Sequence, residues 1–206
     1  MPFSPVESEE QRLKRQKKAL RAHYRMLRKQ ISPESRNLLD SALLANLAGH
    51  SLFQRAEKIL FYYPVKGEPN LLPLVKYALQ LKKTVAFPRS DTETYTLSFH
   101  RISELKELSL GAYDIPEPPE AHPMLTDFSD ALCIVPALAF DRFGYRLGQG
   151  KGFYDRFLAT FNGTSVGLLY GRFLTDQLPH DQYDRSVDLM ITEKGDILPY
   201  EEKPFK

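Results

Sequence analysis

The sequence has little or none of several features that mark particular classes of protein. Its 206 residues include a single cysteine, Cys133, which excludes an internal disulfide framework and a cysteine-based zinc finger. No apolar run approaches the roughly 20 residues that a membrane-spanning helix needs. The first ten residues lack the apolar stretch of a secretory signal and are too acidic for a typical transit peptide. We therefore expect a soluble protein of a reducing compartment, most simply the cytoplasm, with no membrane partner.

Apolar residues are plentiful enough for a packed core. Hydrophobic residues make up 42% and charged residues 26% of the chain, which is typical of a globular protein and not of a disordered one. The length suits one large domain or two small ones, and no loose linker separates two halves. We therefore predict one domain over residues 1–206, with residues 1–10 as a candidate disordered segment.

Acidic residues are absent from one long stretch, residues 11–30, which contains nine basic residues. The whole chain has a net charge of +2, so the remainder carries −7, and this asymmetry indicates that the stretch meets an anion. Apolar side chains recur in it at helical spacing, and a basic ridge of Lys17, Arg21, Arg25 and Arg28 runs beside them. The candidate anions are a nucleotide, nucleic acid, a membrane surface and the acidic remainder of this protein. Taken alone, the pattern favours a solvated helix docked on that remainder.

An RNA-binding role for this helix is one alternative. Such a surface needs exposed aromatic side chains among its cations, because bases stack on them. Tyr24 is the tyrosine within the stretch, and it lies on the apolar stripe and not among the cations. We therefore expect no nucleic-acid partner.

Strand and helix patterns alternate over most of the chain, which predicts a mostly parallel sheet in a three-layer α/β protein. Ser32 and Pro33 suit the N-cap and the first position of a helix. The most apolar run should be the central strand, and the strand over residues 95–102 should lie at an edge. Pro88 should end the strand that begins at residue 84. Helices are predicted over residues 33–49, 71–81 and 152–161, and strands over residues 58–65, 84–88, 95–102, 131–140, 164–170 and 187–192.

A glycine-rich loop follows the most apolar strand and precedes a helix. Gly148, Gly150 and Gly152 alternate there, and glycine permits positive φ and the close approach of a ligand. Successive backbone N–H groups can then form an anion nest, with Arg146 and Lys151 adding positive charge on each side. The spacing matches neither a Walker A motif nor G-x-G-x-x-G, so it supports neither a P-loop NTPase nor a dinucleotide fold. The pattern predicts phosphate binding, and a tightly turned loop without a ligand is the alternative.

Carboxylates near this loop have both structural and functional interpretations. Asp155 lies near the start of the predicted helix, where it stabilises the helix dipole or holds a Mg²⁺ ion that bridges nucleotide phosphates. The loop before the last strand carries Asp176, Asp181, Asp184 and Asp188, and loop aspartates are usually solvated or turn-forming. One of these four is a candidate second magnesium ligand. Without further information the structural interpretation is favoured for Asp155.

The segment PALAFDRFGYRLGQGKGFYDRFL, residues 136–158, resembles the signature of the 5-formyltetrahydrofolate cyclo-ligase family. The resemblance implies a three-layer α/β/α fold with a mostly parallel sheet, similar to sugar-phosphate isomerases and CoA transferases. It also implies an ATP- and Mg²⁺-dependent ligase that converts 5-formyltetrahydrofolate to 5,10-methenyltetrahydrofolate and releases ADP and phosphate. Weaker motifs follow the family's order at residues 17–21, 62–64 with Glu68, 87–89, 115–118 and 178–188.

The resemblance further implies a role for individual positions. Lys17 and Arg21 would contact ATP phosphates, which gives the basic ridge a specific anion. Arg146 and Lys151 would stabilise charge on the transferred phosphoryl group. Asp155 and Asp184 would bind magnesium. The full ATP-binding set is Lys17, Arg21, Arg146, Leu147, Gly148, Gln149, Gly150, Lys151, Gly152, Phe153 and Tyr154. The folate-binding set is Tyr63, Glu68, Gln149, Gly150, Lys151, Gly152 and Phe153.

The implied chemistry needs no protein nucleophile, consistent with the lack of a strong Ser-His-Asp or Cys-His arrangement in the sequence. ATP would phosphorylate the formyl oxygen, and the folate N10 would then close the ring. Phe153 stands where family members usually have tyrosine, and Pro69 and Asp114 are further departures, but none of them removes a charged group. A non-catalytic nucleotide- or folate-binding module on the same fold is the alternative function. We expect a monomer.

Overall fold

Eight strands form the central sheet of the computed structural model, which describes residues 7–65 and 67–201. These strands are β1 (Lys58–Leu60), β2 (Thr84–Asp91), β3 (Thr96–Ile102), β6 (Met124–Leu125), β7 (Ala131–Val135), β10 (Thr164–Leu168), β12 (Leu189–Thr192) and β13 (Gly195–Ile197). Their order is β13-β12-β10-β7-β1-β2-β3-β6. The five neighbours from β12 to β2 are parallel, whereas β13, β3 and β6 pair antiparallel. The prediction of a mostly parallel sheet is therefore confirmed.

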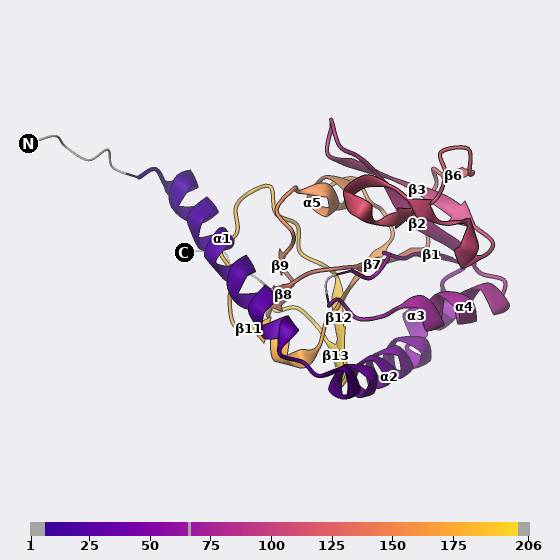
Figure 1. The fold of residues 1–206 in the computed structure, drawn as a ribbon, viewed down its shortest axis with the longest axis horizontal. Helices are drawn as coiled ribbons and strands as arrows, with labels where there is room; N and C mark the ends of the chain where they lie inside the picture. The colour runs from indigo at the N-terminus through magenta and orange to yellow at the C-terminus, as the bar shows by residue number, and fades with distance from the viewer. Residues whose placement is uncertain (1–6, 66, 202–206) are drawn as a thin grey trace, which may run out of the picture.

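Both faces of this sheet are covered, which makes the three layers of the predicted α/β fold (Figure 1). One face carries α2 (Pro33–Gly49), α3 (Ser51–Arg55) and α4 (Leu72–Gln80). The other carries α5 (Phe153–Leu158) and a small sheet in which β8 (Ala139–Asp141) lies between β11 (Leu174–Thr175) and β9 (Arg146–Leu147). The long helix α1 (Glu9–Lys29) contacts β9. Short elements complete the chain: η1 (Leu105–Glu107), β4 (Ser109–Leu110), η2 (Ala112–Asp114), β5 (Pro116–Glu117) and η3 (Gly171–Phe173).

The two long helices begin where their capping residues place them. Ser32 caps α2 as predicted, since its Oγ accepts from the Ser35 N–H at 3.2 Å and Pro33 occupies the first turn. Ser8 caps α1 in a reciprocal capping box with Gln11. Because α1 therefore begins at Glu9, the expectation of disorder is wrong for residues 8–10. The part of that expectation that concerns residues 1–6 lies outside the described residues.

Two prolines act differently from the prediction. The 131–140 run is not one strand: β7 ends at Val135, and the chain after Pro136 enters the small sheet as β8. A central strand has a hydrogen-bonded neighbour on each side, so a proline within it would leave a neighbour's carbonyl without its N–H donor. Pro88, in contrast, does not end β2, which continues to Asp91. Its pairing with β1 stops at Ala86, so at Pro88 the strand pairs only with β3 and one side needs no donor.

Other elements are shorter than predicted or lie elsewhere. β1 stops at Leu60, although Phe61 and Tyr62 beyond it stay buried. α5 spans six residues only, with Phe157 buried and Leu158 partly buried, whereas the prediction extended the helix to residue 161. β3 does not lie at the edge, because β6 pairs with its outer side. The antiparallel edge strand β13 has no counterpart in the prediction.

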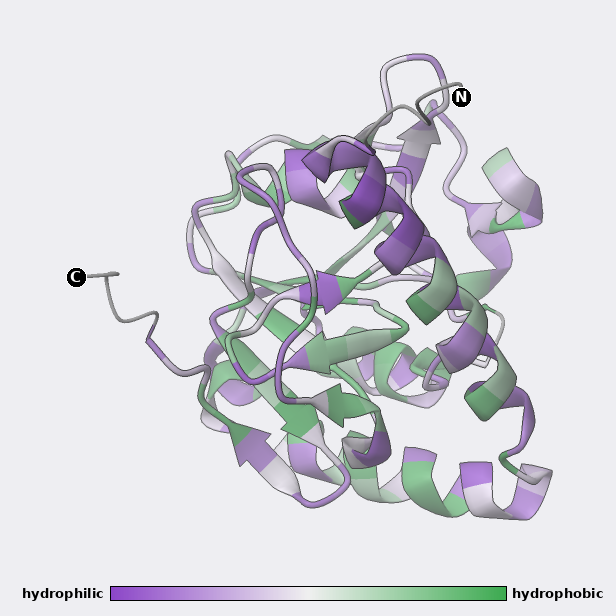
Figure 2. Ribbon diagram, turned by 90° about the vertical axis from the view of Figure 1, so that its left-hand side faces the viewer, coloured by the Kyte–Doolittle hydropathy of each residue, from purple (hydrophilic) through white to green (hydrophobic). Residues whose placement is uncertain are grey.

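The core lies between the layers. Every residue of β7 is buried, which confirms its central position. Figure 2 shows hydrophobic strands in the interior and the mainly hydrophilic α1 along the outside. Burial raises the pKa of the Cys133 thiol in β7 far above its ordinary value, so this thiol is protonated and inert, as expected for a core cysteine. Within residues 7–65 and 67–201, the helices are too short or too polar to cross a bilayer.

Candidate functional site

The site lies where β1 and β7 end side by side in the middle of the sheet. From here the chain after β1 leads through α4 on one face, and the chain after β7 leads through α5 on the other. In open α/β sheets, ligands bind at such a divergence, in the crevice outside the carboxyl ends of the strands. Arg28 of α1 spans this point, because its guanidinium donates to the carbonyls of Gly67, Ala137 and Leu138 at 2.9, 2.5 and 3.1 Å.

Arg28 is consequently a buried structural residue. Its exposed fraction is 1%, so the prediction that places it on the basic ridge with solvated neighbours is wrong for this position. Burial lowers the pKa of its guanidinium, and the Glu68 carboxylate opposes that shift. Its guanidinium also lies over the Phe173 ring, with the guanidinium carbon 4.9 Å from the ring centroid.

The glycine-rich loop, residues 148–152, begins directly after the β8–β9 hairpin. Arg146 and Leu147 lie on β9 and not in the loop, and both are buried. The hairpin turn is held by Asp141, whose carboxylate accepts from the N–H groups of Phe143 and Tyr145 at 3.0 Å each. Two glycines of the loop, Gly150 (φ +103°) and Gly152 (φ +73°), have the predicted left-handed backbone. Gly148 does not, and it has open space around the position of a Cβ.

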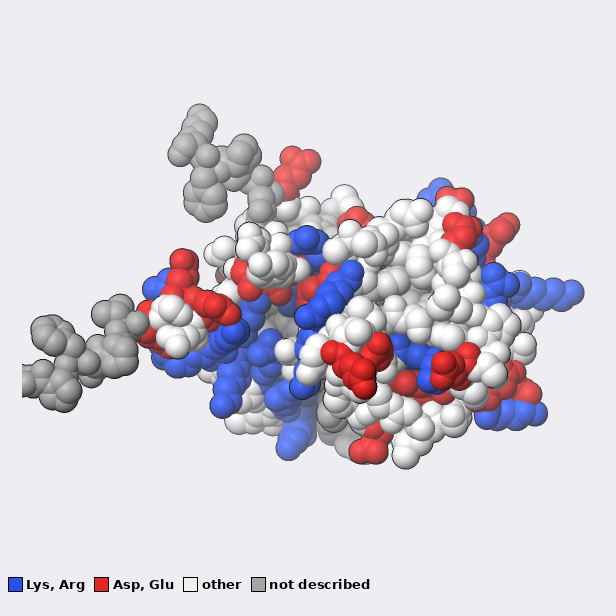
Figure 3. Space-filling model, turned by 90° about the horizontal axis from the view of Figure 1, so that it is seen from above, with Lys and Arg blue, Asp and Glu red and all other residues white. Residues whose placement is uncertain are grey.

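Helix α1 holds the first half of this loop. Arg21 Nε donates to the Gly148 carbonyl at 2.9 Å, and Arg25 Nη2 donates to Gln149 Oε1 at 2.7 Å. Lys17 Nζ is 2.5 Å from Asp184 Oδ2. Lys and Arg side chains gather along α1 in the charge view (Figure 3). The structure thus brings the predicted ATP-binding residues of the N-terminal helix against the loop more than one hundred residues later.

Arg146 links the loop to the two predicted metal ligands. Its side chain is almost fully buried and donates to Asp155 Oδ1 and to the Arg185 carbonyl, both at 2.7 Å. Burial lowers the pKa of Arg146, and the nearby Asp155 and Asp184 carboxylates oppose that shift. Asp155 Oδ1 also accepts from the Arg185 N–H at 3.2 Å. Both carboxylates therefore contact a cation: Asp155 pairs with Arg146, and Asp184 pairs with Lys17.

The donor chemistry of Asp155 and Asp184 fits magnesium only as a partial ligand set. Among residues 7–65 and 67–201, no group of three or more His, Cys, Asp or Glu side chains is arranged to hold a metal. Mg²⁺ accepts one or two carboxylates when phosphate oxygens and water complete its shell. The two aspartates thus suit a metal that arrives with a nucleotide. Magnesium binding stays a prediction.

Two predicted folate residues, Tyr63 and Glu68, lie outside the loop, in the chain that follows β1. Glu68 is buried, and its Oε2 accepts from the Val65 N–H at 3.2 Å. The Tyr154 hydroxyl at the start of α5 is also buried, and it has no hydrogen-bond partner among the described residues. Burial raises the pKa of Tyr154 well above its ordinary value, and the Cys133 and Glu68 side chains add to that shift. Tyr63 is half-buried against the core. Glu68, which follows β1, and Tyr154, at the start of α5, therefore lie within electrostatic reach of each other.

Sequence reasoning missed three side chains that contact the loop. Tyr95 and Tyr113 place their ring centroids 5.8 and 6.0 Å from that of Phe153. The Arg156 guanidinium donates to the Lys151 carbonyl at 2.9 Å. No periodicity or motif marks the two tyrosines, because they lie in the 91–96 turn and in η2. The position of Arg156 one turn after Gly152 is the one available sequence signal.

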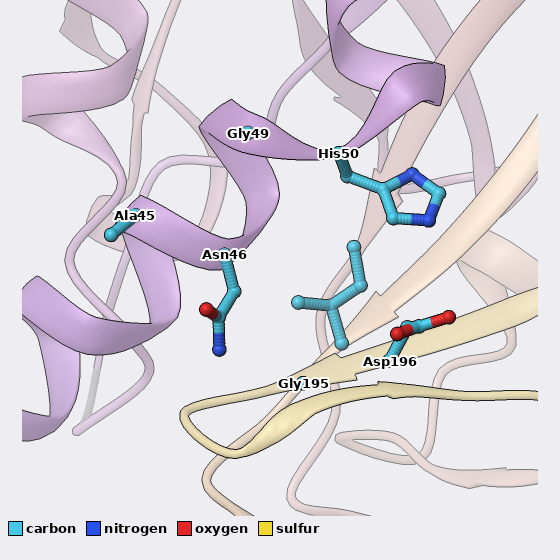
Figure 4. A pocket seen from close by; sticks show the side chains of 7 residues that line it. Ala45, Asn46, Gly49, His50, Gly195 and Asp196 are labelled. Atoms are coloured by element: carbon cyan, nitrogen blue, oxygen red, sulfur yellow. The ribbon is translucent and has the colours of Figure 1, made fainter.

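Two cavities of about 330 Å³ lie beyond the crevice. One is lined by Leu13 of α1 and by Gln177, Leu178, Pro179 and His180, beside the Lys17–Asp184 pair. The other lies between the end of α2 and the β12–β13 hairpin, where Asn46, His50 and Asp196 border it (Figure 4). The Asn46 amide there donates to the Thr192 carbonyl at 2.8 Å. This second cavity shares no lining residue with α1 or the loop.

Fold and site together define a class of protein. A mostly parallel α/β sheet with a cationic, glycine-rich loop at the carboxyl ends of its strands is the arrangement of proteins that bind phosphorylated ligands. Residues 13–193 match the sequence profile described as the 5-formyltetrahydrofolate cyclo-ligase family. The chain belongs to this family of enzymes, and the resemblance read from residues 136–158 is confirmed.

Named relatives agree with this assignment over nearly their whole length. The 5-formyltetrahydrofolate cyclo-ligase of Mycolicibacterium smegmatis is 30% identical over 195 residues, which cover 82% of this chain and 98% of the relative. The enzyme of the same name from Mus musculus is 24% identical over 189 residues, covering 86% and 93%. A solved 5,10-methenyltetrahydrofolate synthetase from Aquifex aeolicus has a TM-score of 0.79 at 34% identity, covering 92% and 96%. One from Mycoplasma pneumoniae, at 22% identity and a TM-score of 0.69, shows the same fold, covering 86% and 98%.

Proposed function

We propose that this protein cyclises 5-formyltetrahydrofolate to 5,10-methenyltetrahydrofolate with ATP and magnesium, and releases ADP and phosphate. One observation carries the proposal: α1 holds the glycine-rich loop through Arg21 and Arg25, and Arg28 of the same helix lies within electrostatic reach of the buried Glu68 carboxylate. Family membership supplies the reaction class. The geometry supports the proposed sites, because a loop with positive charge on both sides suits a triphosphate and a buried carboxylate suits the N–H groups of a pterin.

The reaction balances without a protein nucleophile. The formyl oxygen attacks the γ-phosphorus of ATP, and the bond to ADP breaks. The folate N10 then attacks the formyl carbon, the phosphorylated oxygen leaves as phosphate, and N10 loses its proton. The protein contributes position and charge, as in other phosphoryl transfers. Lys151 stabilises charge on the moving phosphoryl group, and Arg146 supports the same charge from its buried position.

The other predicted site residues, from the loop and from outside it, orient the two substrates. Lys17 and Arg21 contact phosphate oxygens from α1, and the backbone of residues 147–154 wraps the nucleotide. Glu68 accepts from the pterin, Tyr63 lines its pocket, and Gln149 and Phe153 face both substrates. The Tyr154 hydroxyl, which has no partner in the described protein, is positioned to bond the bound substrate.

The cavity beside α1 suits the nucleobase. Leu13 lies four residues before Lys17, which is about 6 Å along a helix axis, and the nucleobase of a nucleotide lies at a similar separation from its phosphates. The apolar parts of Leu178 and Pro179 offer a face for a planar ring, and Gln177 and His180 offer polar atoms.

Magnesium, held by Asp155 and Asp184 together with phosphate oxygens, would screen the charge of the triphosphate when it is bound. Asp155→Asn is expected to raise the Mg²⁺ concentration for half-maximal activity about tenfold or more, since one anionic ligand is lost. A magnesium titration at saturating ATP measures this. Asp176→Asn is the matched control, because Asp176 is an exposed carboxylate that pairs with Arg142 at 2.9 Å. An unchanged titration in Asp155→Asn would leave Asp155 a structural role, through Arg146, the Arg185 N–H and the helix dipole.

The direct test is an absorbance assay for methenyl product with purified protein, 5-formyltetrahydrofolate, ATP and Mg²⁺. Product that forms only when ATP and Mg²⁺ are both present supports the proposal. Binding of ATP or folate without ATP consumption would instead identify the non-catalytic module. RNA binding at micromolar protein with a strong salt dependence would revive the role of α1 in nucleic-acid binding. A monomeric state and a cytoplasmic location are also part of the proposal, although a relative from Arabidopsis thaliana is named as mitochondrial.

A further inference from the structure

The turn between β2 and β3 reaches the glycine-rich loop through a single aromatic ring. The Lys151 Nζ lies 5.4 Å from the ring centroid of Tyr95, and the Arg156 guanidinium carbon lies 5.8 Å from the same centroid. The Phe153 ring meets the Tyr95 ring edge-on at 5.8 Å. One side chain of a distant turn therefore contacts the second half of the loop and the first turn of α5.

The backbone at Tyr95 has an unusual conformation that fixes where this ring lies. Tyr95 has a φ of +56°, in the left-handed region that non-glycine residues seldom adopt. The preceding turn is held by Asp91, whose Oδ1 accepts from the Glu93 and Thr94 N–H groups at 2.8 and 3.2 Å. A left-handed tyrosine persists only when its surroundings hold it, and such residues cluster at functional sites.

Arg156 and Tyr95 contact different parts of the second half of the loop: Arg156 contacts its backbone, and Tyr95 contacts the Lys151 side chain. Arg156 Nη1 donates to the Lys151 carbonyl, and a Cβ on Gly152 would come within 2.8 Å of the same atom, so Arg156 holds the backbone. The Lys151 ammonium is exposed and lies on the face of the Tyr95 ring. A ring face attracts an ammonium through its quadrupole and limits where a long, flexible side chain can lie.

We propose that Tyr95 is a positioning residue for Lys151: its ring holds the ammonium at the mouth of the loop before ATP binds. The inference rests on the proposed function, since it gives a position to the cation that acts on the transferred phosphoryl group. A lysine already confined needs less ordering when the phosphates arrive, so the benefit falls on turnover and not on folate binding.

The test compares three variants of the full chain. Tyr95→Leu is expected to lower kcat about 2- to 30-fold, the range of one cation–π contact, with an unchanged KM for folate. Tyr95→Phe keeps the ring face and should stay within about twofold of wild type. Leucine, like tyrosine, is unbranched at Cβ and so tolerates the same backbone. Tyr200→Leu is the matched control: Tyr200 holds Arg142 and Phe143 by the same two kinds of contact, away from the loop.

A double-mutant cycle makes the test specific to Lys151. In a Lys151→Ala background, Tyr95→Leu should cause no further loss of kcat, because the ring then has no ammonium to hold. Independent losses that add would overturn the proposal, as would a Tyr95→Leu enzyme with wild-type kcat. A second readout needs no turnover: mass spectrometry after limited acetylation of ATP-free protein should show faster modification of Lys151 in Tyr95→Leu than in Tyr95→Phe. If wild-type protein forms no product, the proposed function fails first, and this acetylation comparison still decides the contact.

Discussion

Replacing Lys151 by alanine should lower turnover at least about 100-fold while the fold is retained, the loss typical of a preorganised electrostatic donor. Lys151 is exposed at the loop, and its contact is with the Tyr95 ring, so no buried partner is left behind when it is removed. The loss should therefore appear in kcat and not in the melting temperature. Steady-state kinetics with thermal unfolding of the same preparation measures both.

Two further variants sharpen this expectation. Lys76→Ala removes an exposed lysine from α4 on the other face of the sheet, and it should change neither kcat nor stability. Lys151→Arg keeps the charge but spreads it over a planar group, so it should recover only part of the lost turnover. Near-normal turnover in Lys151→Ala would remove this residue from the phosphoryl-transfer step.

Replacing Arg28 by methionine should lower the free energy of unfolding by about 3–5 kcal/mol, because the change leaves buried polar groups without hydrogen-bond partners. The variant keeps most of the buried stem but removes the donors to the Gly67, Ala137 and Leu138 carbonyls. It also leaves the buried Glu68 carboxylate without the positive charge of this guanidinium nearby. In a chain of this length the loss corresponds to a fall of roughly 10 °C in Tm.

The control for Arg28 lies on the same helix. Lys18→Met removes an exposed cation of α1, so its free energy of unfolding should change by less than about 0.5 kcal/mol. Arg28→Lys keeps a charge without the guanidinium fork and should fall between the two. Denaturant unfolding of the three variants measures the differences. Equal stability of Arg28→Met and Lys18→Met would show that the carbonyls at the crevice find other donors.

Much of the fold could be predicted from sequence because its signals are local. Ser32 and Pro33 set the start of α2, and the apolar residues 131–135 identify the central strand. Strand ends were harder. Pro136 ends a strand and Pro88 does not, and the difference depends on whether a neighbouring strand needs the missing N–H, which only the sheet order shows.

The candidate site could also be predicted from sequence only in part. The alternating glycines and their flanking cations predict an anion site without any structure, and two of the three glycines have the left-handed backbone that the argument needs. The sequence does not show which basic residues of α1 contact the loop and which are buried. Arg21 and Arg25 contact the loop while Arg28 points into the protein, and helical periodicity alone cannot separate these positions because they follow each other at four- and three-residue spacing along one face.

The amino-acid order alone determined the kinds of element, the family and the position of the glycine-rich loop, since each is encoded in neighbouring residues. The three-dimensional arrangement decided which side chains pair around that loop: Lys17 with Asp184, Arg146 with Asp155, and Tyr95 with Lys151. Contacts of this kind depend on the order of strands in the sheet and on the crossing of α1 over β9. They result from packing the whole chain at once, so no local spacing contains them.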